Sequence, residues 1–186
     1  AAGRMVLAMQ VSDTSPERIL DNIHQAKEDG AHIAVIAPPS QFMLPTPERL
    51  LDHYVRAISK SPLPIGIYDR GRFASVAIPD QVARQIVAHR NVLLVKDSSS
   101  DPSRRNVLLA ARRENKRLLL FDGNEFQCVD YLKAGYDGLL LGGGIFNGLL
   151  ARQILEAVKA GNLAEAEKID RRLIRVNYAV YGGKKI

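Results

Sequence analysis

The sequence alternates short apolar runs with longer amphipathic segments, and this alternation restricts the fold more than any other feature. Such a pattern is typical of repeated βα units that build a parallel sheet. Six units can be read along the chain. The expected strands cover residues 5–11, 32–37, 64–68, 92–96, 118–121 and 138–141.

The amphipathic segments carry helix start and stop signals. Ser15 and Thr46 are each followed by proline and glutamate, which is typical of a capped helix start, and Gly30 ends the first of these helices. The remaining helices are expected to begin at Pro79 and Asp101 and to cover residues 125–134, about 148–160 and 163–176. Because no linker or low-complexity segment interrupts the pattern, residues 1–186 are expected to form a single domain.

Six βα units leave two architectures open. A closed βα barrel uses eight parallel strands and typically about 250 residues, whereas this chain has 186. It is therefore either an open doubly wound sheet or a barrel whose opening strands lie outside the sequence. Both architectures place functional residues at the carboxyl ends of the strands.

The composition excludes several classes of protein. With 46% hydrophobic and 25% charged residues, the chain is expected to fold rather than remain disordered. No apolar run approaches the roughly 20 residues of a membrane helix, and the first residues do not resemble a signal peptide, so we expect a soluble, cytoplasmic protein that binds no membrane. The single cysteine, Cys128, and the scattered histidines offer no zinc spacing, so no metal is expected.

Lys96 directly continues a buried apolar strand, which is unusual for a lysine. Burial of an unpaired ammonium is costly and favours the neutral amine, which is a nucleophile that forms Schiff bases with carbonyl compounds. The alternative is that the side chain bends past the strand end and pairs with a carboxylate such as Asp97.

Tyr68 ends the preceding strand, twenty-eight positions before Lys96. One helix separates the two residues, so in a consecutively wound sheet they leave neighbouring parallel strands on the same rim. A phenol placed there could shuttle protons. The alternative is a half-buried aromatic whose hydroxyl meets a backbone partner.

Other polar and glycine-rich stretches give weaker signals. Gly123 and residues 142–144 could present backbone N–H groups to an anion or could form tight turns. No dinucleotide or Walker fingerprint is present. A basic cluster surrounds one helix, and the lack of a nucleic-acid motif and the 6% aromatic content favour a solvated surface over a nucleic-acid site. Its members are Arg104, Arg105, Arg112, Arg113, Lys116 and Arg117.

Four blocks of the sequence resemble the pyruvate-dependent class I aldolases of the dihydrodipicolinate synthase and N-acetylneuraminate lyase family. They are Leu-Pro-Ile-Gly-Ile-Tyr at 63–68, Val-Leu-Leu-Val-Lys-Asp-Ser-Ser at 92–99, Phe-Asp-Gly-Asn at 121–124 and Ala-Gly-Tyr-Asp-Gly-Leu-Leu at 134–140. The resemblance extends over nearly the whole chain. It implies an α/β fold, a TIM (βα)8 barrel with about six units present plus C-terminal helices, as one partial domain over residues 1–186.

The resemblance also implies a function. Lys96 is expected to form an imine with pyruvate or another 2-oxo acid, Tyr68 to relay protons, and Gly123 and Leu140 to line the pocket near the bound oxo acid. The implied protein is a lyase that makes or cleaves a carbon–carbon bond with an aldehyde, or dehydrates a sugar acid, without a cofactor. A homo-oligomer, either a dimer or a tetramer, is expected.

Several positions depart from the family pattern. The family's Gly-Thr-Thr-Gly-Glu-like strand exit, which holds the substrate carboxylate, has no counterpart among the 186 residues. Phe73 stands where the synthases carry a carboxylate-binding arginine, and the segment 38–42 lacks their second relay tyrosine. These departures leave two alternatives open: a non-catalytic binding or assembly protein of similar fold, and an unrelated phosphate-binding barrel enzyme.

Overall fold

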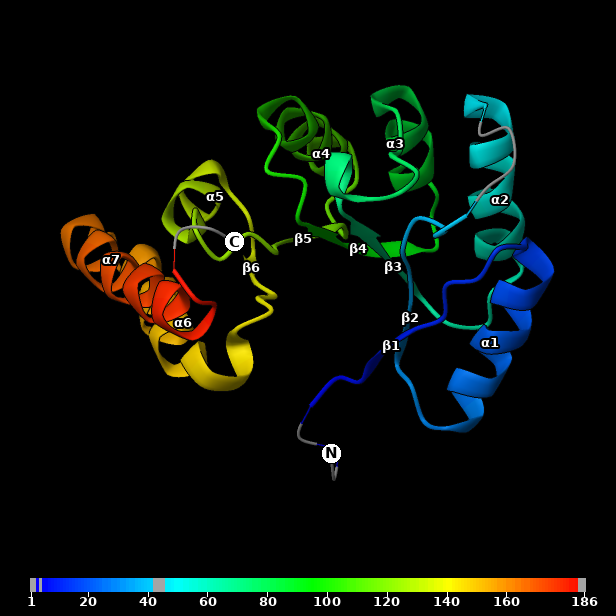
Figure 1. Ribbon diagram of the computed structural model, residues 1–186. Helices are drawn as coiled ribbons and strands as arrows, with labels where there is room; N and C mark the ends of the chain where they lie inside the picture. Colours follow the sequence, from blue (N-terminus) through cyan, green and yellow to red (C-terminus); the bar gives the residue numbers. More distant parts are fainter. Residues whose placement is uncertain (1–2, 4, 42–45, 184–186) are drawn as a thin grey trace. The chain divides into compact units, whose positions relative to one another are not determined.

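The computed structural model describes Gly3 and residues 5–41 and 46–183, and in them helices and strands alternate as predicted (Figure 1). The strands are β1 (Ala8–Gln10), β2 (Ile33–Ile36), β3 (Ile65–Asp69), β4 (Val92–Asp97), β5 (Leu119–Asp122) and β6 (Gly138–Leu139). The helices are α1 (Pro16–Glu28), α2 (Pro47–Lys60), α3 (Asp80–Val87), α4 (Pro102–Glu114), α5 (Cys128–Ala134), α6 (Gly144–Lys159) and α7 (Leu163–Val180), with a 3-10 turn at Gly71–Phe73.

The contacts divide the chain into two compact units, Ala1–Leu119 and Leu120–Ile186. In the first unit β1, β2, β3 and β4 pair in that order, and all three pairings are parallel. Helices α1 to α4 contact one another in sequence order. This is the arrangement that consecutive βα units adopt when each helix returns the chain to the start of the next parallel strand.

Three of the predicted helix starts in the first unit are confirmed by side-chain caps, and the remaining helix, α3, begins after Pro79 as predicted but without such a cap. The side chains of Ser15 and Thr46 accept hydrogen bonds from backbone N–H groups three residues on, and Asp101 accepts one from Ser103. These bonds satisfy N–H groups that a helix leaves unpaired at its first turn. Within the described residues, no helix is long and apolar enough to cross a membrane.

In the second unit β5 and β6 are parallel, and α5, α6 and α7 enclose an apolar core that includes Cys128, Ile154 and Leu173. The sequence predicted that this helix begins at residue 125, but α5 begins at Cys128. The reason is a local turn, in which the Asp122 and Asn124 side chains accept hydrogen bonds from backbone N–H groups two residues on.

Asp170 on α7 has a partly buried carboxyl group. Its Oδ1 atom is buried and makes no hydrogen bond to the described residues. Burial, and secondarily the neighbouring Asp130 carboxylate, raise the pKa of Asp170 to about 6. Between about pH 4 and 6 the folded chain therefore holds a proton that the unfolded chain releases, so this carboxyl lowers stability progressively as the pH rises through that window.

Replacing Asp170 with asparagine is therefore expected to stabilise the protein at neutral pH. The amide cannot ionise, so the free energy of unfolding should rise by roughly 1–2 kcal/mol near pH 7 and remain unchanged near pH 4. Urea unfolding at the two pH values measures this. An equal gain at both would contradict the assignment of the effect to ionisation.

Candidate active site

Tyr68 and Lys96 lie side by side at the carboxyl ends of β3 and β4. They are register partners in the parallel pairing, and the Lys96 Nζ atom lies 4.3 Å from the centroid of the Tyr68 ring. Both side chains are half-buried. The Lys96 Nζ atom thus rests over the Tyr68 ring, the position from which a lysine makes a cation–π contact.

The two alternative arrangements considered for these residues are not observed. Among the described residues, Lys96 forms no ion pair with a carboxylate, and the Tyr68 hydroxyl makes no hydrogen bond. Asp97 is fully buried and accepts a hydrogen bond from the Ser99 backbone N–H at 2.9 Å. The Lys96 amine therefore contacts the Tyr68 ring rather than a carboxylate of the described residues.

A cavity of about 480 Å³ lies beside Tyr68. Its wall is mainly polar, whereas typical small-molecule pockets are mainly apolar. Lys96 is not part of the wall, and its amine contacts Tyr68, which is. Phe42, the last residue of the segment that lacks the relay tyrosine, falls outside the described residues. The lining residues are Gln10, Ser12, Asp13, Thr14, Ala37, Pro38, Pro39, Ser40, Tyr68, Arg70, Ala74 and Ser75.

Asp13 contributes a negative charge to this wall. The Thr14 backbone N–H donates to Asp13 Oδ1 at 2.6 Å, and this hydrogen bond lowers the pKa of Asp13, with a further contribution from Arg18, whose Nε lies 3.1 Å from the same oxygen. Arg70 brings a positive charge to the same cavity. The wall therefore offers groups of both signs beside hydroxyl and amide side chains.

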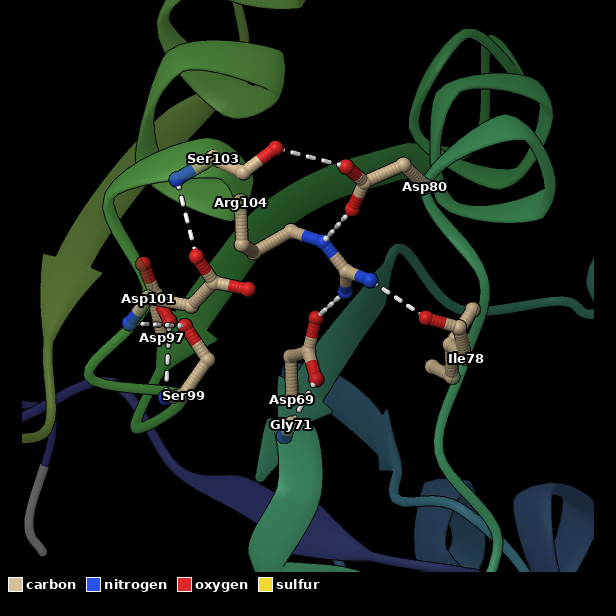
Figure 2. Close-up of polar contacts among 9 residues, drawn as sticks. All are labelled: Asp69, Gly71, Ile78, Asp80, Asp97, Ser99, Asp101, Ser103 and Arg104. Atoms are coloured by element: carbon tan, nitrogen blue, oxygen red, sulfur yellow. Dashed lines mark hydrogen bonds and ion pairs between the residues drawn. The ribbon is translucent and has the colours of Figure 1, made fainter.

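The residue after Tyr68 belongs to a buried ion-pair network (Figure 2). Asp69 is 2% exposed, and its Oδ2 pairs with the guanidinium of Arg104, which is 5% exposed. Arg104 also pairs through Nε with Asp80 Oδ1 at 3.0 Å and donates from Nη2 to the Ile78 carbonyl. The prediction that Arg104 belongs to a solvated surface is therefore wrong.

The spacing of apolar residues in α4 contained the signal for this burial. Arg104 precedes Val107 and Leu108 by three and four positions, so all three share one face of the helix, and all three are buried. A charged side chain on that face can be buried because two carboxylates and a carbonyl meet it.

Gly71, two residues after Asp69, allows the loop after β3 to approach the chain after Lys96. It has a positive φ of 51°, and a Cβ atom there would lie 2.7 Å from Ser99 Cβ and 2.9 Å from Ser99 Cα. Its backbone N–H donates to Asp69 Oδ1 at 2.8 Å. Glycine at this position therefore fixes both the turn and the close packing.

Replacing Gly71 with alanine is expected to destabilise the protein by roughly 1–3 kcal/mol, because the left-handed backbone and the contact with the Ser99 backbone both oppose a Cβ atom. Thermal and urea unfolding measure the loss. Gly148, inside α6, is the matched control, since a Cβ there meets nothing within 4 Å and alanine favours a helix. An unchanged stability for G71A would contradict the close packing.

Gly123 and Leu140 lie at the carboxyl ends of β5 and β6. Gly123 directly follows β5 and Leu140 directly follows β6, and the Leu140 N–H donates to the Asp122 carbonyl at 2.8 Å. The Leu140 side chain is 42% exposed. Gly123 is a strand exit, as predicted, whereas Leu140, which was expected inside a strand over 138–141, follows a strand that ends at Leu139. The role of both as pocket residues stays a prediction.

In the part of the chain that the structure describes, no three His, Cys, Asp or Glu side chains are grouped as a metal site requires. Burial raises the pKa of Cys128, the single cysteine, well above its ordinary value. Its thiol is therefore an apolar core group rather than a nucleophile.

The chain is similar in sequence to known synthases. The sequence profile of the Dihydrodipicolinate synthetase family matches residues 1–182. The 4-hydroxy-tetrahydrodipicolinate synthase of Xanthomonas campestris pv. campestris is 25% identical over 173 residues, which are 92% of this chain and 56% of the relative. The same enzyme of Geobacter sp. strain M21 is 27% identical over 95% of this chain and 59% of its own length. The chain thus spans less than two thirds of the length of these relatives.

Solved structures share the fold. The dihydrodipicolinate synthase of Thermotoga maritima superimposes with a TM-score of 0.89 at 21% identity, covering 99% of this chain and 63% of that one. CdNal from Clostridium difficile, solved with mannosamine, gives 0.86 at 18% identity over 97% and 61% of the two chains. YagE from E. coli K12, solved with pyruvate, gives 0.85 at 16% identity over 94% and 59%.

These likenesses confirm the predicted fold class, an α/β chain that forms part of a TIM barrel. The profile match covers nearly every residue, including both strand ends that carry Tyr68 and Lys96. The chain therefore belongs to the Dihydrodipicolinate synthetase family.

Proposed function

We propose that this chain carries the catalytic lysine of a pyruvate-dependent class I aldolase, with Lys96 as the Schiff-base residue and Tyr68 as its proton relay. The observation that carries the proposal is the contact of the Lys96 amine with the Tyr68 ring at the ends of two paired strands. Family membership supports it, as does the pyruvate bound to the structural relative YagE.

The chemistry follows from these two groups. The neutral amine of Lys96 adds to the ketone carbon of a 2-oxo acid, and loss of water from the adduct gives an imine, which is cationic when protonated. The cationic imine makes the neighbouring methyl acidic, so loss of a methyl proton gives an enamine. The enamine carbon then adds to an aldehyde, and water releases the product and restores the amine.

Each of these steps moves a proton, which gives Tyr68 its role. The hydroxyl can donate to the departing water and to the alkoxide that forms from the aldehyde, and it can take the proton back when the bond breaks. Because the Tyr68 hydroxyl makes no hydrogen bond to the described residues, no protein group has to be displaced before it meets the substrate.

The cavity beside Tyr68 provides a place for the aldehyde. Its serine and threonine hydroxyls, with Gln10, Asp13 and Arg70, suit a second substrate that bears hydroxyl or carboxylate groups. The mannosamine bound to CdNal is in keeping with such a substrate class. The same residues serve either direction of the reaction, synthesis or cleavage.

Exchange of the methyl protons of pyruvate in D2O tests this function, because exchange requires the imine and the enamine but no aldehyde. We expect NMR to show loss of the methyl signal at a rate proportional to protein concentration. Binding of pyruvate without exchange would instead support the non-catalytic alternative. Binding of inorganic phosphate but not of pyruvate would support a phosphate-binding enzyme.

A further inference from the structure

We propose that Arg104 is a positioning residue for the pair formed by Tyr68 and Lys96, and that it acts through Asp69. The proposal rests on the function proposed above. Arg104 touches neither member of the pair, yet its guanidinium binds the residue that follows Tyr68 (Figure 2). It therefore controls the direction of the strand end that carries the phenol.

The Arg104 guanidinium binds three separate segments of the chain. It pairs with Asp69 at the end of β3, with Asp80 at the start of α3 and with the carbonyl of Ile78 before that helix. The planar guanidinium meets these acceptors through three different nitrogens, Nη1, Nε and Nη2. Charge-assisted bonds from a planar donor fix orientation as well as distance.

The same contacts hold the loop that forms part of the cavity wall. Asp69 lies before the loop and Ile78 near its end, and Arg70, Ala74 and Ser75 between them line the cavity. Arg104 thus ties both ends of this loop to one point on α4. Since the side chain is 5% exposed, water does not loosen these contacts.

A backbone contact extends the network to the strand that carries Lys96. The Ser98 N–H donates to the Asp69 carbonyl at 2.7 Å, and Asp69 and Asp97 are register partners one residue beyond Tyr68 and Lys96. Fixing Asp69 therefore fixes the end of β3 against the end of β4. The amine then remains over the ring, where an ångström-scale displacement can slow a reaction by about 100-fold.

Burial alone does not require this arrangement. A buried ion pair is often no more stabilising than apolar side chains of the same volume, so stability gives no reason for a charged cluster at this point. A rigid, directional link between α4 and the end of β3 does give a reason for the charged cluster. Proton relay requires that the Tyr68 phenol is held in a fixed position, and the network of Arg104 holds it there.

The test measures how fast pyruvate and borohydride trap the protein, using R104K and R104M, with R113M as the matched control on the exposed part of α4. A positioning role predicts that the first-order trapping rate at saturating pyruvate falls by about 10- to 100-fold while the final trapped fraction stays complete. A merely structural role lowers the trapped fraction and leaves the rate of the folded molecules unchanged. R113M is expected to match the parent in both.

A double-variant cycle with Y68F decides whether the effect passes through the phenol. R104K is expected to slow trapping in the parent chain and to add little in the Y68F chain, because coupled residues are not additive. Equal slowing in both chains would overturn the proposal, as would a parent-like rate for folded R104K, or a failure of both Arg104 variants to fold. If the parent chain itself traps no pyruvate, the proposed function fails, and the proposed role of Arg104 fails with it.

Discussion

Replacing Lys96 with arginine is expected to abolish exchange of the pyruvate methyl protons, with a loss on the order of 10³-fold or more. Arginine keeps the positive charge and can still lie on the Tyr68 ring, but its guanidinium stays protonated and is not a nucleophile. No imine can form, so the methyl does not become acidic. The rate of exchange followed by NMR measures the loss.

The stability of K96R separates loss of chemistry from loss of structure. Lys96 is half-buried and contacts the Tyr68 ring, so the free energy of unfolding should change by less than about 1 kcal/mol. Lys60, exposed at the end of α2, is the control position, and K60R should exchange pyruvate at the parent rate. A K96R variant that retains exchange would contradict the imine assignment.

Removing the Asp69 carboxylate is expected to produce the largest loss of stability among the substitutions considered. The D69A variant leaves the Arg104 guanidinium buried without one of its two carboxylate partners, and breaking such a pair from one side typically costs about 3–5 kcal/mol. The midpoint of urea unfolding should fall accordingly. D69N keeps one oxygen, which can accept either from the Gly71 N–H or from Arg104 but not from both as the two carboxylate oxygens do, so it should lose less than D69A but remain destabilised.

Asp101 provides a contrasting carboxylate in the same region. It is exposed and accepts a hydrogen bond from the Ser103 backbone N–H at 2.9 Å as the cap of α4, so D101A should lose only about 1 kcal/mol. The difference between D69A and D101A measures what burial of the charge adds. Equal losses at the two positions would mean that the Arg104 pair is energetically unimportant.

The order of the strands and the helix starts of the first unit could be predicted from the sequence because their signals are local, whereas α6 begins at Gly144 rather than at about residue 148. The apolar run before Lys96 and the caps at Ser15 and Thr46 depend only on neighbouring residues. The adjacency of Tyr68 and Lys96 needed one more rule, that consecutive βα units place successive strands side by side. The structure confirms this adjacency.

The supporting contacts could not be predicted in the same way. Arg104 belongs to a run of basic residues, and its burial depends on Asp69 and Asp80, which lie 35 and 24 positions away. The start of α5 depends on a turn set by Asp122 and Asn124, which competes with the helix for the same backbone groups. Composition and periodicity do not reveal such pairings.

The most direct measurement of the central claim is reductive trapping of the protein with pyruvate and borohydride, followed by mass spectrometry of the intact chain and its peptides. The account predicts that the mass increases by one reduced pyruvyl group and that the modified peptide carries it on Lys96. An unmodified protein, or a modification on any other lysine, would contradict the account.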